Sequence, residues 1–153
     1  MLPDSDAVRA VYLDPQSGIL AGVSAVETLA PSPSGKKIVM ECGTIENDTI
    51  LSVARDFQDR VSNRGEVITF VDAPVSGGPM GAQAGTLTFM VGCPPSLSSR
   101  IFPTVTSYLR HMGNEDGIFL CGDIGAGTAF KIINNYRQMI NWLFQTFGNH
   151  KVF

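Results

Sequence analysis

Several features that would mark other kinds of protein are absent from this sequence of 153 residues. Its longest basic run is the pair Lys36-Lys37 and its net charge is −3, which does not indicate a nucleic-acid-binding surface. No uninterrupted apolar stretch reaches the ~18 residues of a membrane span. The N-terminus is acidic and lacks the apolar segment of a signal peptide. We therefore expect an intracellular protein, cytoplasmic or in the mitochondrial matrix, that binds neither nucleic acid nor membrane.

Cysteine is scarce, and its spacing excludes the usual paired sites. The three residues, Cys42, Cys93 and Cys121, form no Cys-x-x-Cys pair, and each ends an apolar run. A free cysteine in such a place behaves as a small hydrophobic residue. We therefore expect three buried thiols, with neither a disulfide nor a metal site.

The sequence does contain enough apolar material for one ordinary domain. Hydrophobic residues make up 44% of the chain and charged residues only 16%. This composition argues against disorder. A chain of this length buries roughly 70% of the surface that its unfolded form exposes, so its core needs no metal or disulfide.

Extended and helical patterns alternate along the chain. Short apolar runs predict strands at 37–42, 67–71, 86–91 and 118–121. Apolar residues at helical spacing, with capping residues before them, predict helices at 5–13, 48–63, 94–109 and 125–147. Residues 18–22 are predicted to form a turn and residues 30–35 a loop. This alternation favours an α/β domain with a parallel or mixed sheet.

The stretch DAPVSGGPMGAQAGTLTFMVG, residues 72–92, is the most informative part of the sequence. Five glycines lie within sixteen residues, directly after a predicted strand. Such a segment lets backbone amides approach an anion closely, and Ser76 adds a hydroxyl on the same turn. It is therefore a candidate receptor for a carboxylate. An ordinary hairpin loop, whose glycines serve only the turns, explains the composition equally well.

A second glycine-rich segment, residues 122–135, follows a predicted strand and opens a helix. The dinucleotide fingerprint Gly-x-Gly-x-x-Gly fails here, because Phe130 stands where the third glycine belongs. The phosphate-binding pattern of nucleotide triphosphatases fails as well, because Thr128 stands where lysine is required. The segment therefore matches neither phosphate-binding motif.

The same segment places a lysine early in a helix. Lys131, Asn134 and Asn135 are spaced to share one helix face. The helix dipole and partial burial would both lower the pKa of a lysine there, toward values useful for general acid–base chemistry. The alternative is a solvated lysine on a polar face, although its apolar neighbours make a fully exposed position less favourable.

Taken with these motifs, the chain resembles the β-hydroxyacid dehydrogenases, and most closely those of the 3-hydroxyisobutyrate dehydrogenase type. DAPVSGG followed by AGTLTFMVG resembles the family's substrate-binding signature, and residues 125–135 resemble its catalytic helix. Met1-Leu2-Pro3 is similar to a turn that contacts the dinucleotide, and residues 40–45 are similar to a segment near the nicotinamide. The resemblance implies a partial Rossmann-like fold, with residues 1–122 in the NAD(P)-binding domain and residues 123–153 beginning a helical domain.

The resemblance also implies a reaction and a role for each matching residue. The activity would be oxidation of a small 3-hydroxy acid to its semialdehyde with NAD or NADP, by an enzyme that is usually homo-oligomeric. Lys131 would be the catalytic base and Asn135 would orient the substrate hydroxyl. The substrate carboxylate would be bound by Ser76, Gly77 and Gly78. The cofactor side would be lined by Leu2, Pro3 and Thr44.

Two departures from the family pattern define the alternatives. The glycine-rich turn that binds pyrophosphate does not occur in the sequence, so we expect a truncated, aggregation-prone chain with little turnover. The alternative function is therefore a non-catalytic remnant that at most binds small acids or a partner. A decarboxylating relative of the 6-phosphogluconate dehydrogenase type is disfavoured, because Asn134 stands where that family has histidine.

Overall fold

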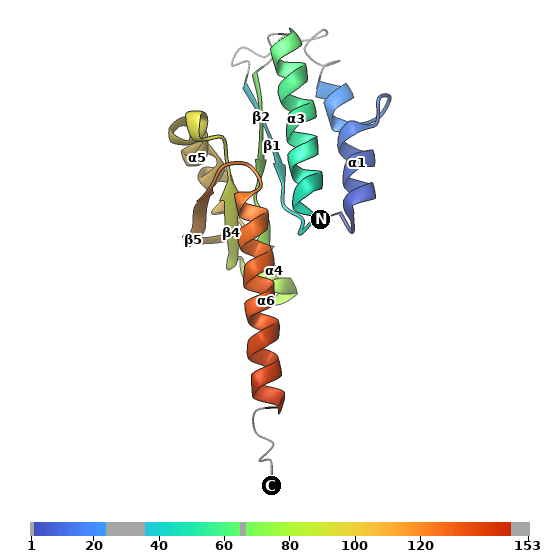
Figure 1. The fold of residues 1–153 in the computed structure, drawn as a ribbon. Coiled ribbons are helices and arrows are strands. Elements are labelled where there is room, and N and C mark those ends of the chain that lie inside the picture. The colour runs from blue at the N-terminus through green and yellow to red at the C-terminus, as the bar shows by residue number, and fades with distance from the viewer. Residues whose placement is uncertain (1, 24–35, 65–66, 148–153) are drawn as a thin grey trace.

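The computed structural model describes residues 2–23, 36–64 and 67–147, and this part of the chain folds as an α/β structure (Figure 1). In chain order its elements are α1 (Ser5–Leu13), β1 (Lys36–Glu41), α3 (Asn47–Arg64), β2 (Val67–Asp72), β3 (Val75–Ser76), α4 (Gly78–Ala84), β4 (Leu87–Gly92), α5 (Pro95–Leu109), β5 (Gly113–Gly122) and α6 (Ala126–Phe147). The predicted strands and long helices are confirmed, with their ends displaced by a few residues at most except in β5.

The sheet is mixed, as the α/β prediction allowed. Its path runs β1-β2-β4-β3, and β5 pairs with β4. The pairs β1–β2 and β4–β5 are parallel, whereas β2–β4 and β3–β4 are antiparallel. The β2–β4 pairing is confined to Asp72 opposite Gly92, so the two parallel pairs meet at the carboxyl end of β2.

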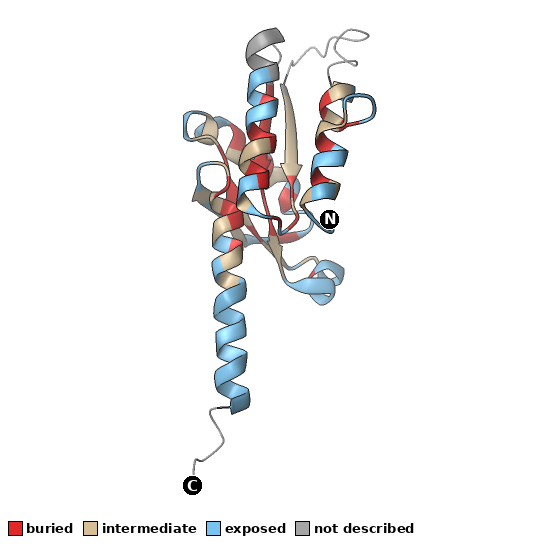
Figure 2. Ribbon diagram, turned by 45° about the vertical axis from the view of Figure 1, so that its right-hand side comes forward, coloured by how far each residue is buried: buried red, intermediate tan, exposed pale blue. Residues whose placement is uncertain are grey.

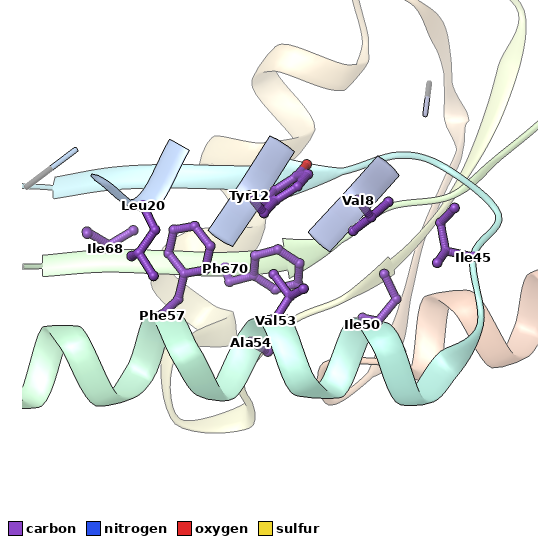
Figure 3. Packing of buried hydrophobic residues seen from close by; sticks show 10 residues of the cluster. All are labelled: Val8, Tyr12, Leu20, Ile45, Ile50, Val53, Ala54, Phe57, Ile68 and Phe70. Carbon is purple, nitrogen blue, oxygen red and sulfur yellow. The ribbon is translucent and has the colours of Figure 1, made fainter. Parts of the chain in front are cut away.

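One hydrophobic core lies between the sheet and the helices α1 and α3 (Figure 3). Its centre is aromatic: the ring of Phe70 lies 6.0 Å from that of Tyr12 and 5.6 Å from that of Phe57. Tyr12 meets both rings edge-on, the arrangement that the charge distribution of aromatic rings favours. This core holds α1 and α3 against β2. Both helices begin at the edge of the sheet that is formed by the carboxyl ends of β1 and β2 (Figure 1).

A second core lies on the other face of the sheet. Successive residues of a strand point to opposite faces, so Phe70 packs in the first core and Val71 in the second. There Val71 and Phe89 pack with the apolar side of α5, which buries Val105 completely. The sheet is therefore covered on both faces, as expected where strands read as continuous apolar runs.

Three local predictions are wrong. Residues 19–23 are helical rather than a turn, because Asp14 accepts hydrogen bonds from the amides of Gln16 and Ser17 and redirects the chain into a new helix. β5 begins at Gly113, five residues earlier than predicted, because it follows the edge of β4 through backbone pairing. Only Cys93 is a buried thiol; Cys42 and Cys121 are free but partly exposed. The loop predicted at 30–35 lies outside the described residues.

Helix α6 projects far beyond the rest of the structure. Its first turns pack against β4 and β5, and the remainder extends away from the sheet (Figure 1). From Asn135 to Phe147 every residue is exposed, as the pale blue lower half of the helix shows (Figure 2). Within the described residues, no helix combines the length and apolar character needed to span a bilayer.

Candidate functional site

A groove of about 640 Å³ lies where α6 crosses the sheet. One wall comes from β3, β4 and β5, and the other from the second to fourth turns of α6. The residues that line it are Ser76, Thr88, Met90, Phe119, Leu120, Cys121, Phe130, Ile133, Asn134, Arg137 and Gln138. The groove is therefore mainly apolar, with a few polar groups that could orient a small ligand.

Ser76 is held in this groove by the short strand β3. It lies opposite Thr88 of β4, so both hydroxyl-bearing residues line the same wall. The two glycines that follow have backbone angles that favour glycine, with φ of 134° at Gly77 and 59° at Gly78. A side chain at Gly77 would also press against Leu87, at 3.0 Å from its Cδ2 atom. The chain thus turns sharply from β3 into α4, and both glycine residues remain exposed there.

The antiparallel pairing of β3 with β4 makes this segment a hairpin, as the alternative interpretation had it, but the connection contains a short helix, α4. Gly78 to Ala84 form a seven-residue helix that begins after Gly77 and ends at Gly85. Gly85 adopts the left-handed conformation, with φ of 66°, as glycine commonly does after the end of a helix. The glycines therefore serve the turns at both ends of α4 and position Ser76.

Lys131 is buried on the inner face of α6, with 8% of its surface exposed. Burial lowers the pKa of its amine, because a charged ammonium group loses solvation there. The solvated-lysine alternative is thus ruled out by the packing. A buried amine whose pKa is lowered is suited to accept and return a proton.

The two asparagines that follow Lys131 have different surroundings. Asn134 is partly buried and lines the groove together with Ser76. Asn135 is exposed and is not among the groove residues. Helical spacing allowed either residue to face the same way as Lys131, and the structure brings Asn134 to the groove.

Asp72 is a buried carboxylate that sequence reasoning did not single out. It stands at the carboxyl end of β2 and is 0% exposed. Its Oδ1 atom accepts a hydrogen bond from the amide of Gly125 at 2.7 Å. Its Oδ2 atom accepts from the amide of Thr128 at 2.7 Å and from the Thr128 hydroxyl at 3.0 Å. Burial raises the pKa of Asp72, although these hydrogen bonds act in the opposite direction.

Two glycines leave the space in which this carboxylate lies. A Cβ atom on Gly92 would overlap the Asp72 carboxylate. A Cβ atom on Gly127 would overlap the carbonyl oxygen of Met90 and would lie 3.0 Å from Oδ2 of Asp72. Close contact between α6 and the sheet therefore depends on residues without side chains at both positions.

The residues predicted to line the cofactor side gather at the edge of the sheet where α1 and α3 begin. Leu2 packs against the first core, whereas Pro3 and Thr44 are exposed. Thr44 lines a hollow of about 380 Å³ at this edge. The other residues of the hollow include three acids, Asp4, Asp6 and Glu46.

This acidic rim decides which part of a dinucleotide could fit. Phosphate groups would be repelled by three carboxylates, whereas the cationic ring of an oxidised nicotinamide would be attracted. Thr44 and the exposed start of α1 could therefore hold the nicotinamide end of such a cofactor. The hollow does not provide a pyrophosphate site.

A second buried carboxylate, Glu41, lies at the carboxyl end of β1. It is 3% exposed and accepts a hydrogen bond of 2.5 Å from the amide of Gly43. Its negative charge adds to burial in raising the pKa of the neighbouring Cys42 to about 11. An acid that ends an apolar strand is the signal that marks both Glu41 and Asp72 in the sequence.

Comparisons with known proteins agree with this geometry. Residues 1–122 match the family described as the NAD binding domain of 6-phosphogluconate dehydrogenase. A 3-hydroxyisobutyrate dehydrogenase of Pseudomonas aeruginosa is 39% identical over 135 residues, which cover 88% of this chain and 38% of that protein. An NAD-dependent L-serine dehydrogenase of the same organism is 38% identical, with the same coverage of both chains.

A solved structure gives the same relation in three dimensions. The Mycobacterium tuberculosis 3-hydroxyisobutyrate dehydrogenase, described with L-serine, superposes with a TM-score of 0.63 at 33% identity. The match covers 88% of this chain and 38% of that one. The chain thus spans well under half the length of these relatives.

Proposed function

Because the chain belongs to the family of NAD-binding domains of the 6-phosphogluconate dehydrogenase type, we propose that it is part of an NAD- or NADP-dependent oxidoreductase. The substrate would be a small 3-hydroxy acid, which is oxidised to its semialdehyde. Similarity to two dehydrogenases that act on 3-hydroxyisobutyrate and L-serine supports this substrate class.

The observation that carries the proposal is the burial of Lys131, which does not itself line the groove but lies between the groove residues Phe130 and Asn134 on α6. A lysine at 8% exposure is unusual in a folded protein, and Asn134, one helical turn further on, lines the same groove as Ser76. The lowered pKa of the Lys131 amine makes its neutral, proton-accepting form accessible nearer to neutral pH.

Each residue then has a defined task. The nicotinamide, when bound, supplies the hydride acceptor. Lys131 accepts the proton of the substrate hydroxyl, and Asn135, one helical turn beyond Lys131, orients that hydroxyl from the exposed side of the groove residue Asn134. Ser76, Gly77 and Gly78 bind the substrate carboxylate and thereby fix the reacting carbon. Leu2, Pro3 and Thr44 line the cofactor side, where the acidic rim favours the nicotinamide ring over phosphate.

We assign residues 1–122 to the cofactor-binding domain and residues 123–153 to the beginning of a helical domain. The family match over residues 1–122 supports this boundary. The projection of α6 away from the sheet, with its outer half exposed, supports it as well (Figure 2).

A non-catalytic role is the second candidate, and one feature favours it. The hollow beside Thr44 is lined by three acids, Asp4, Asp6 and Glu46, which repel the phosphate groups of a dinucleotide. In that case the groove would bind a small acid without turnover. For the isolated chain we expect weak dinucleotide binding and a low rate.

Isothermal titration calorimetry with NAD and with NADP distinguishes the two candidate functions. Saturable binding supports the oxidoreductase, and the absence of saturable binding supports the non-catalytic role. Turnover of 3-hydroxyisobutyrate and L-serine is then measured at high protein concentration. Lys131→Met should lower any rate about 10²- to 10⁴-fold, the usual contribution of a general base.

Lys37→Met is the matched control, because Lys37 lies on β1 and lines a different hollow. It should leave the rate unchanged. Equal rates for Lys131→Met and the unaltered chain would rule out Lys131 as the base.

A further inference from the structure

Helix α6 begins without a capping side chain of its own. Its first helical residue is Ala126, and the residue before it, Gly125, has no side chain that could accept a hydrogen bond. Asp123 lies close by in sequence, but its side chain accepts from the amide of Ile124, outside the helix. The amide of Ala126 donates to the carbonyl oxygen of Asp123, so the amides of Gly125 and Thr128 are left for another partner.

Asp72 takes that place from a different element. Its two oxygens accept from the amide before the helix, at Gly125, and from the amide of the third helical residue, Thr128. These are the two amides that a capping box satisfies with two local side chains. Here a single carboxylate does so across 53 and 56 residues of sequence.

A cap that comes from another element has a second effect. A local cap only stabilises the helix end, whereas Asp72 also fixes that end relative to β2. Lys131 follows Thr128 by three residues, so it lies one turn beyond the anchored amide on the same side of the helix. Any shift of the first turn would therefore move Lys131 relative to the sheet.

We propose that Asp72 is a positioning residue that holds Lys131 in its buried place beside the groove by fastening the first turn of α6 to the end of β2. The inference rests on the proposed function only for the chemical role of Lys131. The close fit at Gly92 and Gly127 supports it, because both positions leave room for the carboxylate at the helix start.

The test measures the position of Lys131 without relying on turnover. The amines of the full chain are reductively methylated with ¹³C-formaldehyde, and their NMR signals are titrated with pH. The chain has four lysines, so Lys131→Arg identifies the signal of interest. Hydrogen exchange at the amides of Gly125 and Thr128 is measured in parallel.

Asp72→Asn should accelerate exchange at these two amides roughly tenfold to a hundredfold, because an asparagine cannot accept from both sides. The Lys131 signal should titrate at higher pH, nearer to the other lysines, because the amine regains solvent. The direction is diagnostic, since removing a nearby negative charge would by itself lower the pKa of a lysine. An unchanged or lower Lys131 titration in a folded Asp72→Asn protein overturns the proposal.

Two further variants make the result decisive. Glu41→Gln is the control, because Glu41 is a buried carboxylate that accepts a hydrogen bond from a backbone amide at another place in the sheet. This variant should change neither the pH at which Lys131 titrates nor hydrogen exchange in α6. Thr128→Val removes only the hydroxyl contact and should shift Lys131 in the same direction by a smaller amount. If Asp72→Asn does not fold, an unmoved Lys131 signal in Thr128→Val overturns the proposal. Absence of hydride transfer in the unaltered chain would instead count against the proposed function, and the Lys131 measurement would stand.

Discussion

Replacing Gly127 with alanine should separate α6 from the sheet at its anchored end. The added methyl group would overlap the carbonyl oxygen of Met90 and would lie 3.0 Å from both Oδ2 of Asp72 and the amide nitrogen of Gly92. Two of these three atoms belong to the backbone of β4, so no side-chain rotation can relieve the contact. The helix must therefore move outward.

The magnitude follows from three contributions. Overpacking of this kind costs about 1–3 kcal/mol. Weakened hydrogen bonds to the Asp72 carboxylate cost roughly 1.5–3 kcal/mol more if one bond is lost. Alanine favours the helix over glycine by about 1 kcal/mol, which offsets part of the cost. We expect a net loss of about 2–4 kcal/mol in the free energy of unfolding.

Urea unfolding followed by circular dichroism measures this loss. With a slope near 2 kcal/mol/M, the midpoint should fall by about 1–2 M. Gly22→Ala is the matched control, because Gly22 is also helical but a Cβ atom there would meet nothing within 4 Å. It should be neutral or stabilising by up to about 1 kcal/mol. A Gly127→Ala midpoint equal to that of the unaltered chain would refute the described contact between α6 and β4.

Three further predictions concern pH, thiol reactivity and association. The lowered pKa of Lys131 means that, as pH rises, the folded chain releases this proton before the unfolded chain does. The free energy of unfolding should therefore increase as pH rises from the folded pKa of Lys131 toward 10.5. In urea unfolding at a series of pH values, Lys131→Met should remove this increase. Cys42, with its pKa raised to about 11, should react slowly with iodoacetamide at neutral pH, and Glu41→Gln should accelerate the reaction severalfold; an equal rate would exclude the charge effect. The exposed apolar surface of α6 should cause self-association at micromolar concentration. The double variant Ile140→Lys and Phe144→Glu should lower the sedimentation coefficient toward that of a monomer.

The elements that sequence predicted well are those whose pattern is local. Helix α1 was predicted at 5–13 from its capping residues and apolar spacing, and the structure confirms this helix, with Asp4 as the cap and Val8 and Tyr12 buried. Val11 belongs to the same apolar pattern but is 41% exposed, because the buried stripe of this short helix is narrow. The parallel pair β1–β2 likewise follows from two continuous apolar runs.

What sequence could not supply depends on distant partners. The polar first half of β5, from Gly113 to Gly117, has no strand pattern and is ordered by the neighbouring β4. The choice between Asn134 and Asn135 at the groove depends on how α6 is rotated on the sheet, which helical spacing does not determine. Asp72 looked like the end of a strand, and its partners Gly125 and Thr128 are far away along the chain.

Because α6 is long and fixed to the sheet only at its first turns, a small tilt of the helix moves its two ends by very different distances. At 1.5 Å per residue, Phe147 lies roughly 31 Å along the axis from Ala126, whereas Lys131 lies only about 7 Å along it. If the helix pivots about Asp72, a tilt of roughly 10° moves the far tip by about 5 Å but Lys131 by only about 1 Å. A displacement of that size at a reacting group can change a rate about a hundredfold. The exposed outer half thus acts as a lever arm. A domain or partner that binds it could change the position of Lys131 and so the geometry of proton transfer.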